Sequence, residues 1–350
     1  MGSFIEQIVT LLSSAVAFGT VIMFGSLGEI LTEKSGHLNL GVPGIMYMGG
    51  IGGLLGAFFY ELYAPNPVPL VCMLAALGCA LLASLLGGLI YSFLTVSLRA
   101  NQNVTGLTLT IFGSGLANFF GGSLNKLAGG VGQISVAMTS GVFRATQGFT
   151  DGLVRDLSAS GSGFVRFLGS VMDVLDKLLF SYGFMVYLAV AIALVMSFIM
   201  NRTSVGLNLR AVGENPATAD AAGVNVTRYK YVSTCIGAMV SGLGGLYYVM
   251  DYTKGTWAND GSIEAIGWLA VALVIFATWK PLRSVWGAFL FGGLYWLYNY
   301  IPGLNRSSQE IFKMLPYIVT IIVLITVSLR HKRDDQPPSS LGVSYFREDR

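Results

Sequence analysis

The sequence predicts an all-α, polytopic transmembrane helical bundle, and three features of its composition support that fold class. Only 11% of the 350 residues are charged, whereas a soluble chain carries about 25%. Hydrophobic residues make up 53% of the chain. The 45 glycines are typical of transmembrane helices, in which glycine lets two backbones approach closely. This composition excludes a soluble enzyme, a nucleic-acid-binding protein and a disordered scaffold, and it places the chain in a lipid bilayer.

Apolar stretches mark the individual spans, because a helix needs about 20 residues to cross the hydrocarbon core. The stretch 40–60 contains Pro43 and clustered glycines, which favour a broken or partly re-entrant helix. We expect nine spans, with eight to ten possible, over residues 4–28, 40–60, 68–97, 103–121, 181–200, 229–250, 264–279, 284–301 and 313–329.

Lys and Arg in short loops predict the orientation, since positive charge is retained on the cytoplasmic side. The strongest basic clusters lie in the loop 202–228 and its flanks, at Lys280 and Arg283, and after Arg330. Lys34 and Arg99 fall on the same side when the spans alternate. We therefore expect an outside N-terminus, a transmembrane domain over 1–330 and a cytoplasmic tail over 331–350.

One predicted outside segment, 122–180, is too long for a simple loop. It begins rich in Gly and Ser, and residues 164–180 repeat apolar side chains with helical spacing. Two interpretations of this amphipathic helix stay open. It lies on the outer membrane surface, or it is a docking site for an extracellular partner.

Enzymatic chemistry has little support in the sequence, and we expect no catalytic residue, metal or cofactor. The two histidines, His37 and His331, have no partner at metal-ligand spacing, and no nucleotide-binding glycine loop is present. The predicted helix cores hold almost no ionisable residue, which argues against a relay of buried carboxylates. A stand-alone secondary transporter and a membrane-embedded enzyme are therefore the less favoured alternatives.

The loop 202–228 is polar but has the pattern of a folded structure. We expect two short helices, about 205–213 and 216–222, that break at Glu214–Asn215. Pro216 suits the first position of a helix, and Gly223 suits a left-handed cap. A short helical knob of this kind inserts into a groove on another protein. The alternative is a plain solvated loop.

Several motifs resemble one family, the bacterial ABC-importer permeases of the branched-chain amino acid, simple sugar and nucleoside group. The resemblance covers about 20–330 and is nearest to the nucleoside branch. Pro43 departs from the family pattern, which often has Glu there, and 122–180 matches poorly. The matching segments are 33–41 (EKSGHLNLG), 101–107 (NQNVTGL), 213–224 (GENPATADAAGV), 267–273 (GWLAVAL), 279–282 (WKPL) and 315–317 (LPY).

The resemblance implies a transport subunit of the type II ABC importer kind, in a bacterial inner membrane, that is not itself an enzyme. Its implied partners are an ABC ATPase, an extracellular substrate-binding lipoprotein, and a second related permease, or a second copy of this chain. The implied substrate is a nucleoside, with a simple sugar or branched-chain amino acid as alternatives. The residues that the match assigns to ATPase coupling are Gly213, Glu214, Asn215, Pro216, Ala219 and Gly223.

Uncharged polar groups at helix starts are the candidates for the translocation pathway, because amides donate to and accept from substrate hydroxyls. An indole ring is able to stack weakly on a flat base. The alternative is that these side chains cap helices and join neighbouring helices. The candidate pathway residues are Asn39, Asn101, Gln102, Asn103, Thr105 and Trp268.

Overall fold

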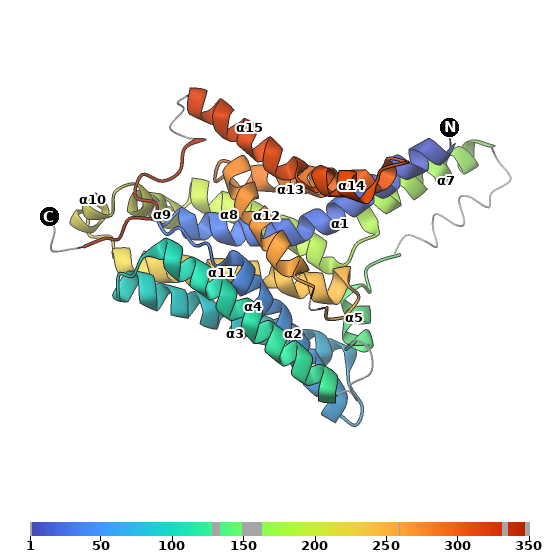
Figure 1. Cartoon of the computed structure of the whole chain (residues 1–350), viewed down its shortest axis with the longest axis horizontal. Helices are drawn as coiled ribbons and strands as arrows, with labels where there is room; N and C mark the ends of the chain where they lie inside the picture. Colours follow the sequence, from blue (N-terminus) through green and yellow to red (C-terminus); the bar gives the residue numbers. More distant parts are fainter. Residues whose placement is uncertain (1, 128–133, 149–162, 259, 331–334, 347–350) are drawn as a thin grey trace.

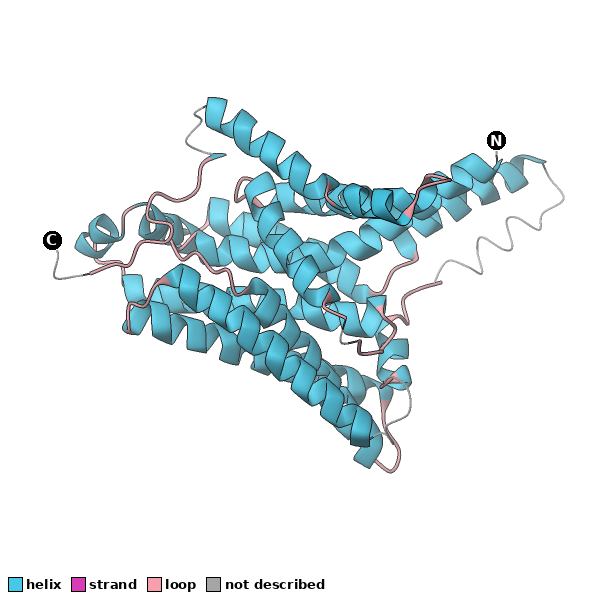
Figure 2. Cartoon of the chain, in the orientation of Figure 1, coloured by secondary structure: helices cyan, strands magenta, loops and turns pink. Residues whose placement is uncertain are grey.

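The structure is a computed structural model that describes residues 2–127, 134–148, 163–258, 260–330 and 335–346. The described part is helical, and its only pairing of extended backbone is an isolated bridge between Ser135 and Thr256 (Figure 2). Long helices run side by side along one direction, with α9 and α10 at one end and α7 at the other (Figure 1). The predicted all-α fold class is confirmed.

Fourteen α-helices are described, and π-helical turns extend three of them. The turns cover Phe93–Ser97, Asp176–Phe180 and Tyr248–Tyr252, and a 3-10 turn covers Leu297–Tyr300. The helices are α1 (Gly2–Glu33), α2 (Val42–Tyr63), α3 (Pro69–Ser92), α4 (Gln102–Leu127), α5 (Ala137–Phe143), α7 (Gly163–Leu175), α8 (Phe184–Arg202), α9 (Ser204–Glu214), α10 (Pro216–Ala221), α11 (Val226–Tyr247), α12 (Ser262–Phe276), α13 (Pro281–Trp296), α14 (Arg306–Lys313) and α15 (Leu315–Arg330).

The nine predicted spans divide into two classes. Within the described ranges, seven helical segments are long and apolar enough to cross a membrane, and the last of them, Arg306–Leu329, joins α14 and α15. The predicted spans 264–279 and 284–301 correspond to α12 and α13, which have only 15 and 16 residues. Helices of that length rise about 23 Å, less than the ~30 Å hydrocarbon core. The loop between them turns sharply, with positive φ at Thr278 and Trp279.

The prediction of a broken helix over 40–60 is wrong. The helix α2 is continuous from Val42, and Pro43 lies in its first turn, where a missing N–H costs nothing. The glycines of α2 are packing residues instead: a Cβ at Gly49 would collide with the backbone of Gly242 in α11. The irregular backbone lies just before α2, over residues 34–41.

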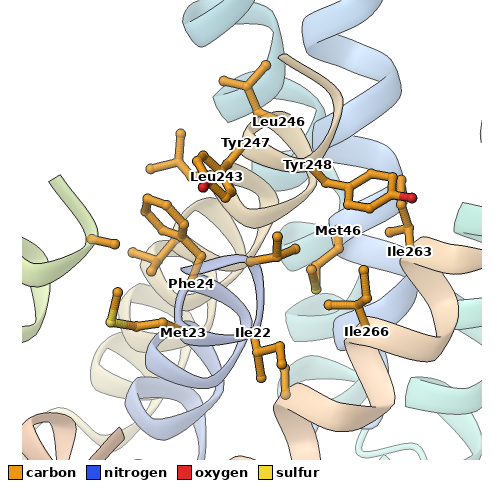
Figure 3. Packing of buried hydrophobic residues seen from close by; sticks show 14 of the residues in the cluster. Ile22, Met23, Phe24, Met46, Leu243, Leu246, Tyr247, Tyr248, Ile263 and Ile266 are labelled. Carbon is orange, nitrogen blue, oxygen red and sulfur yellow. The ribbon is translucent and has the colours of Figure 1, made fainter. Parts of the chain in front are cut away.

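The core is formed by α1, α2 and α11, with α12 against them (Figure 3). Large apolar side chains such as Phe24, Met46 and Tyr247 fill the space between these helices. The helices also approach closely through small residues, since a Cβ at Gly28 would collide with Gly237 and Ser241. We call the contacts of α11 with α1 and α2 through these small residues the glycine seam.

The predicted basic clusters gather at one end of the bundle, here called the basic end. Lys280 and Arg283 both contact Asp335 of the C-terminal tail, and Arg99 lies over the ring of Phe346. The predicted outside segment belongs to the opposite end, where Glu61 accepts a hydrogen bond from the Thr139 backbone (2.8 Å). The two ends therefore separate as the charge pattern predicts.

The amphipathic helix expected within 164–180 is present as α7 and the following π-helical turn. The turn contacts the first part of α1, where Ser13 Oγ donates to the Lys177 carbonyl (2.8 Å). Leu168, Val171 and Leu175 are exposed. The sequence's GS-rich stretches at 128–133 and 149–162 lie outside the described residues, and the role of the segment stays a prediction.

Candidate functional site

Two short helices at the basic end form the most distinctive polar feature of the fold. They are α9 and α10, and they meet at Asn215, whose extended backbone ends one helix and begins the next. The Asn215 side chain accepts a hydrogen bond from the Thr218 backbone (3.0 Å), and Pro216 follows as the first helical residue. Gly223 has φ +85°, a conformation that favours glycine. The predicted helices and their break are confirmed.

The side chains of this pair divide into packed and exposed groups. Ala219 is 3% exposed and packs with Val212 of α9 and Val226 of α11. Glu214, Asn215 and Gly223 are exposed. The pair therefore has an apolar base fixed on α11 and a polar tip, and we call it the coupling knob (204–223). The ATPase-coupling roles of its individual residues stay predictions.

Gly213 connects the coupling knob to the loop between α1 and α2. It is buried, and a Cβ there would collide with the carbonyl oxygen of Lys34. Gly36 lies beside it with φ +85°, so two glycines meet where two backbones cross. The backbone of the knob therefore lies in direct contact with residues 34–36.

The C-terminal tail also lies on the coupling knob, which the sequence did not predict. Ser339 Oγ donates to Glu214 Oε2 (2.7 Å), and Tyr345 donates to Asp220 Oδ2 (2.9 Å). Ser340 donates twice to the Gly213 carbonyl, from its backbone N (3.0 Å) and its Oγ (2.6 Å). These contacts join residues more than 120 positions apart, so no local pattern indicates them.

An ion-pair cluster fixes the start of the described tail. Asp335 Oδ1 lies 2.7 Å from Lys280 Nζ and 2.8 Å from Arg283 Nη1. The hydrogen bond from Lys280, together with that from Arg283, lowers the pKa of Asp335 below its usual range. The tail thus connects the α12–α13 loop to the coupling knob.

Polar side chains from three helices hold the irregular segment 38–41. Gln102 Oε1 of α4 accepts from the Leu38 backbone N (2.8 Å), and Tyr91 of α3 donates to the Leu38 carbonyl (2.6 Å). Glu29 Oε1 of α1 accepts from the Asn39 backbone N (3.0 Å). The helix ends α1, α3 and α4 are therefore joined through one short stretch of backbone, which we call the polar anchor.

Most candidate pathway residues bond to backbone in this structure. Asn39 Oδ1 accepts from Gly41 N (2.9 Å), Asn101 Oδ1 accepts from Val104 N (3.1 Å), and Thr105 Oγ1 donates to the Asn101 carbonyl (2.8 Å). The Asn101 bond is that of a helix N-cap, whereas the other two are local bonds to nearby backbone. Asn103 is exposed, and Trp268 is half-buried on α12. The structure thus brings Asn39 and Gln102 to the polar anchor, whereas Trp268 lies on a different helix.

The expectation that the helix cores hold almost no ionisable residue is wrong near the end of α1 and at both ends of the span Val226–Tyr252, where Asp251 is 8% exposed. The first helix extends five residues beyond the predicted span 4–28, and its last turns bury Glu29 and Glu33 at 1% and 3% exposure. Trp279 Nε1 donates to Glu33 Oε2. Lys230 in α11 is 2% exposed. The partner of Glu33 lies 246 positions away, so hydropathy alone did not reveal its burial.

Comparison with known proteins identifies the family. The family model of the branched-chain amino acid transport system / permease component matches residues 11–324. The putative glucose ABC transporter permease protein TsgC13 of Haloferax volcanii is 31% identical, over 97% of this chain and 98% of its own length. The guanosine ABC transporter permease protein NupQ of Bacillus subtilis is 28% identical over 98% of each chain.

A third relative agrees with these two. The nucleoside ABC transporter permease protein NupC of Lactococcus lactis is 26% identical over 90% of each chain. No solved structure matches the chain. The family model and the relatives are those of transport permeases, in agreement with the helical bundle described above. The chain therefore belongs to the family of branched-chain amino acid transport system / permease components.

Proposed function

We propose that the chain is the permease subunit of an ATP-driven importer for nucleosides, in a bacterial inner membrane. A separate ABC ATPase binds at the basic end, an extracellular lipoprotein delivers the substrate, and a second related permease, or a second copy of this chain, completes the pathway. The observation that carries the proposal is the coupling knob: a rigid, Asn215-capped pair of helices with an exposed polar tip.

The contacts of the knob define a route for force. Closure of the ATPase pair pushes the knob, and Gly213 transfers the displacement to residues 34–36. The polar anchor then carries it to α1, α3 and α4 through Leu38 and Asn39. Because the glycine seam keeps α1, α2 and α11 packed together, the helices tilt as a body and change the side from which the pathway opens.

Charge around the knob suits an ATPase surface with acidic groups. A cavity of about 760 Å³ beside α9 is lined by Lys34, Arg210 and Glu214, together with Lys280 and Arg283 of the next loop. Burial lowers the pKa of Lys34, although Glu214 opposes that shift. Positive groups therefore outnumber negative ones here, and complementary charge steers docking and fixes register.

Relatives named for guanosine, nucleosides and glucose support a polyhydroxylated substrate. Nucleosides and sugars share hydroxyl groups, which uncharged amides and hydroxyls bind without a charged side chain. The glucose relative has the highest identity of the three, so a simple sugar is the second candidate. Branched-chain amino acids lack these hydroxyls and are the least favoured class.

Reconstitution tests the proposal. The chain is placed in proteoliposomes with its co-expressed ATPase and binding protein, and ATP hydrolysis and uptake of guanosine, glucose and leucine are measured. We expect guanosine to stimulate hydrolysis and to accumulate only with ATP. If glucose alone accumulates, the substrate is a simple sugar instead of a nucleoside, and the ATP-driven mechanism still holds. Uptake by the chain alone, without ATP, would contradict the importer itself.

The substitution Glu214→Ala tests the knob. We expect transport to collapse while membrane insertion is retained, because Glu214 lies at the exposed tip. Glu310→Ala is the matched control, since Glu310 is an exposed Glu on α14. Ser339→Ala removes the tail's bond to Glu214 and leaves the carboxylate in place. Unchanged uptake in Glu214→Ala, or an equal loss in Ser339→Ala, would remove Glu214 from ATPase contact.

A further inference from the structure

A second cavity at the basic end borders the coupling knob at Asp220 and Gly223. It measures about 620 Å³ and lies between the π-helical turn after α3 and the start of α11, with the tail along one side. Its wall carries three cationic side chains, one histidine, one carboxylate and two tyrosines: Arg99, Arg228, Lys230, His37, Asp220, Tyr231 and Tyr345.

Lys230 is the unusual member of this wall. Only 2% of the residue is exposed, and burying an ammonium group is costly unless an anion accompanies it. Over the described ranges, no carboxylate lies within ion-pair distance of Lys230. The carboxylate in the wall, Asp220, accepts a hydrogen bond from Tyr345. Among the described residues, the cavity therefore presents a buried positive charge without an ion-pair partner.

The surroundings of Lys230 select the charge and shape of a ligand. Arg99 and Arg228 are exposed at the rim, where their guanidinium groups match the geometry of a phosphate. The N-terminus of α11 begins in the same wall, with Asn225 as its cap, and a helix N-terminus favours an anion. His37 lies in the wall beside Lys230, and the positive charge together with burial lowers its pKa. The wall therefore holds mostly donors to an oxyanion.

We propose that this cavity binds a phosphate group, held by Lys230 in its interior and by Arg99 and Arg228 at its rim. The group belongs to an anionic phospholipid of the surrounding leaflet or to a free phosphate. Basic cavities between transmembrane helices on the cytoplasmic side are suited to lipid head groups. Phe93 and Leu98, 53% and 58% exposed, flank the same turn and offer a surface for acyl chains.

Nanodiscs of two compositions separate the sources. The full-length chain is placed in discs of phosphatidylcholine alone, or of phosphatidylcholine and phosphatidylglycerol in equal parts, and its Tm is measured. Inorganic phosphate is then titrated into the discs of phosphatidylcholine alone. A Tm rise with phosphatidylglycerol only identifies a lipid head group. A saturable rise with inorganic phosphate identifies a free anion.

The variant Lys230→Met decides whether the cavity is responsible. It removes the charge, keeps much of the side-chain volume and breaks no ion pair found in the described part of the chain. We expect it to bind the responsible anion at least about tenfold more weakly. Lys126→Met, an exposed site at the opposite end of α4, removes the same charge and is expected to respond as the wild type.

Two outcomes would overturn the proposal. One is a wild-type Tm that neither phosphatidylglycerol nor phosphate raises. The other is a rise of equal size in Lys230→Met. If Lys230→Met does not fold in phosphatidylcholine discs, Arg228→Gln at the exposed rim replaces it in the same experiment. A Tm rise in Arg228→Gln equal to that of the wild type would then contradict the proposal.

Discussion

The glycine seam and the basic end are held together by different forces. In the seam, backbones touch through small residues, and 78% of the most apolar stretch of α2 and of α11 is buried. At the basic end, side chains bond to backbone: Gln102 and Tyr91 to Leu38, and Ser340 to Gly213. A backbone contact in the seam is disrupted when one carbon is added to a glycine. A hydrogen-bonded group at the basic end is able to change its partner at small cost.

This difference suits the two regions to different tasks. Close packing makes the seam a rigid body, because interiors of that density transmit strain instead of absorbing it. Hydrogen bonds at the basic end are individually worth about 0.5–1.5 kcal/mol, so a modest external force is able to rearrange them. Under the proposed function, force enters through the adjustable region and moves the rigid one.

The largest effect is expected from adding a methyl group in the seam. In Gly49→Ala the new Cβ collides with the backbone of Gly242. We expect a loss of about 1–3 kcal/mol, the usual cost of overpacking. The Tm of the detergent-solubilised chain, measured by fluorescence-detected size exclusion, checks this.

Gly115→Ala is the control for the seam. Its Cβ would meet nothing within 4 Å, and the helix α4 gains from the higher propensity of alanine. We expect an unchanged or slightly higher Tm. Equal losses in the two variants would show that the seam is no more tightly packed than the periphery.

The second prediction tests the polar anchor. Gln102→Leu leaves the part-buried Leu38 N–H without its acceptor, and we expect a loss of about 1 kcal/mol, the lower end of the cost of an unsatisfied buried donor. The same Tm assay is used, with the exposed neighbour Asn103→Leu as control. If Asn103→Leu is as destabilising as Gln102→Leu, the anchor is not what holds residues 38–41.

A smaller effect is expected from the tail. Ser340→Ala removes the Oγ bond to the Gly213 carbonyl and keeps the backbone bond. We expect faster amide hydrogen exchange in residues 335–346, by up to about tenfold, with an unchanged Tm. Ser307→Ala, an exposed serine on α14, is the control. Exchange that does not change in Ser340→Ala would mean that other contacts alone seat the tail.

A separate prediction concerns pH at the basic end. Burial and the nearby Lys230 lower the pKa of His37 in the folded chain. In the unfolded chain, the histidine takes up a proton already below about pH 6.5. Stability is therefore lost as the pH falls from that value towards the lower folded one, by up to about 1.4 kcal/mol per pH unit.

The variant His37→Gln isolates this contribution, since glutamine does not titrate. We expect its Tm to fall less than that of the wild type between about pH 7.5 and pH 5.5. Parallel losses in the two proteins would assign the acid sensitivity to other groups.

The sequence determined what depends on neighbours along the chain. Low charge and abundant apolar residues require a helical membrane bundle, because only closed backbone hydrogen bonding survives in lipid. The coupling knob was also predictable, since an Asn-Pro pair starts a helix wherever it lies and a glycine such as Gly223 ends one. One-sided placement of Lys and Arg separated the two ends.

Tertiary structure alone decided the contacts between distant segments. Pro43 was misread because a proline inside an apolar stretch is indistinguishable from a first-turn proline until the helix start is known. The burial of Glu29 and Glu33, and the seating of the tail at Gly213, depend on partners from other segments of the chain. The pattern of residues along the chain determines which segments form helices. The partner of a polar group depends instead on which surfaces the folded chain brings together.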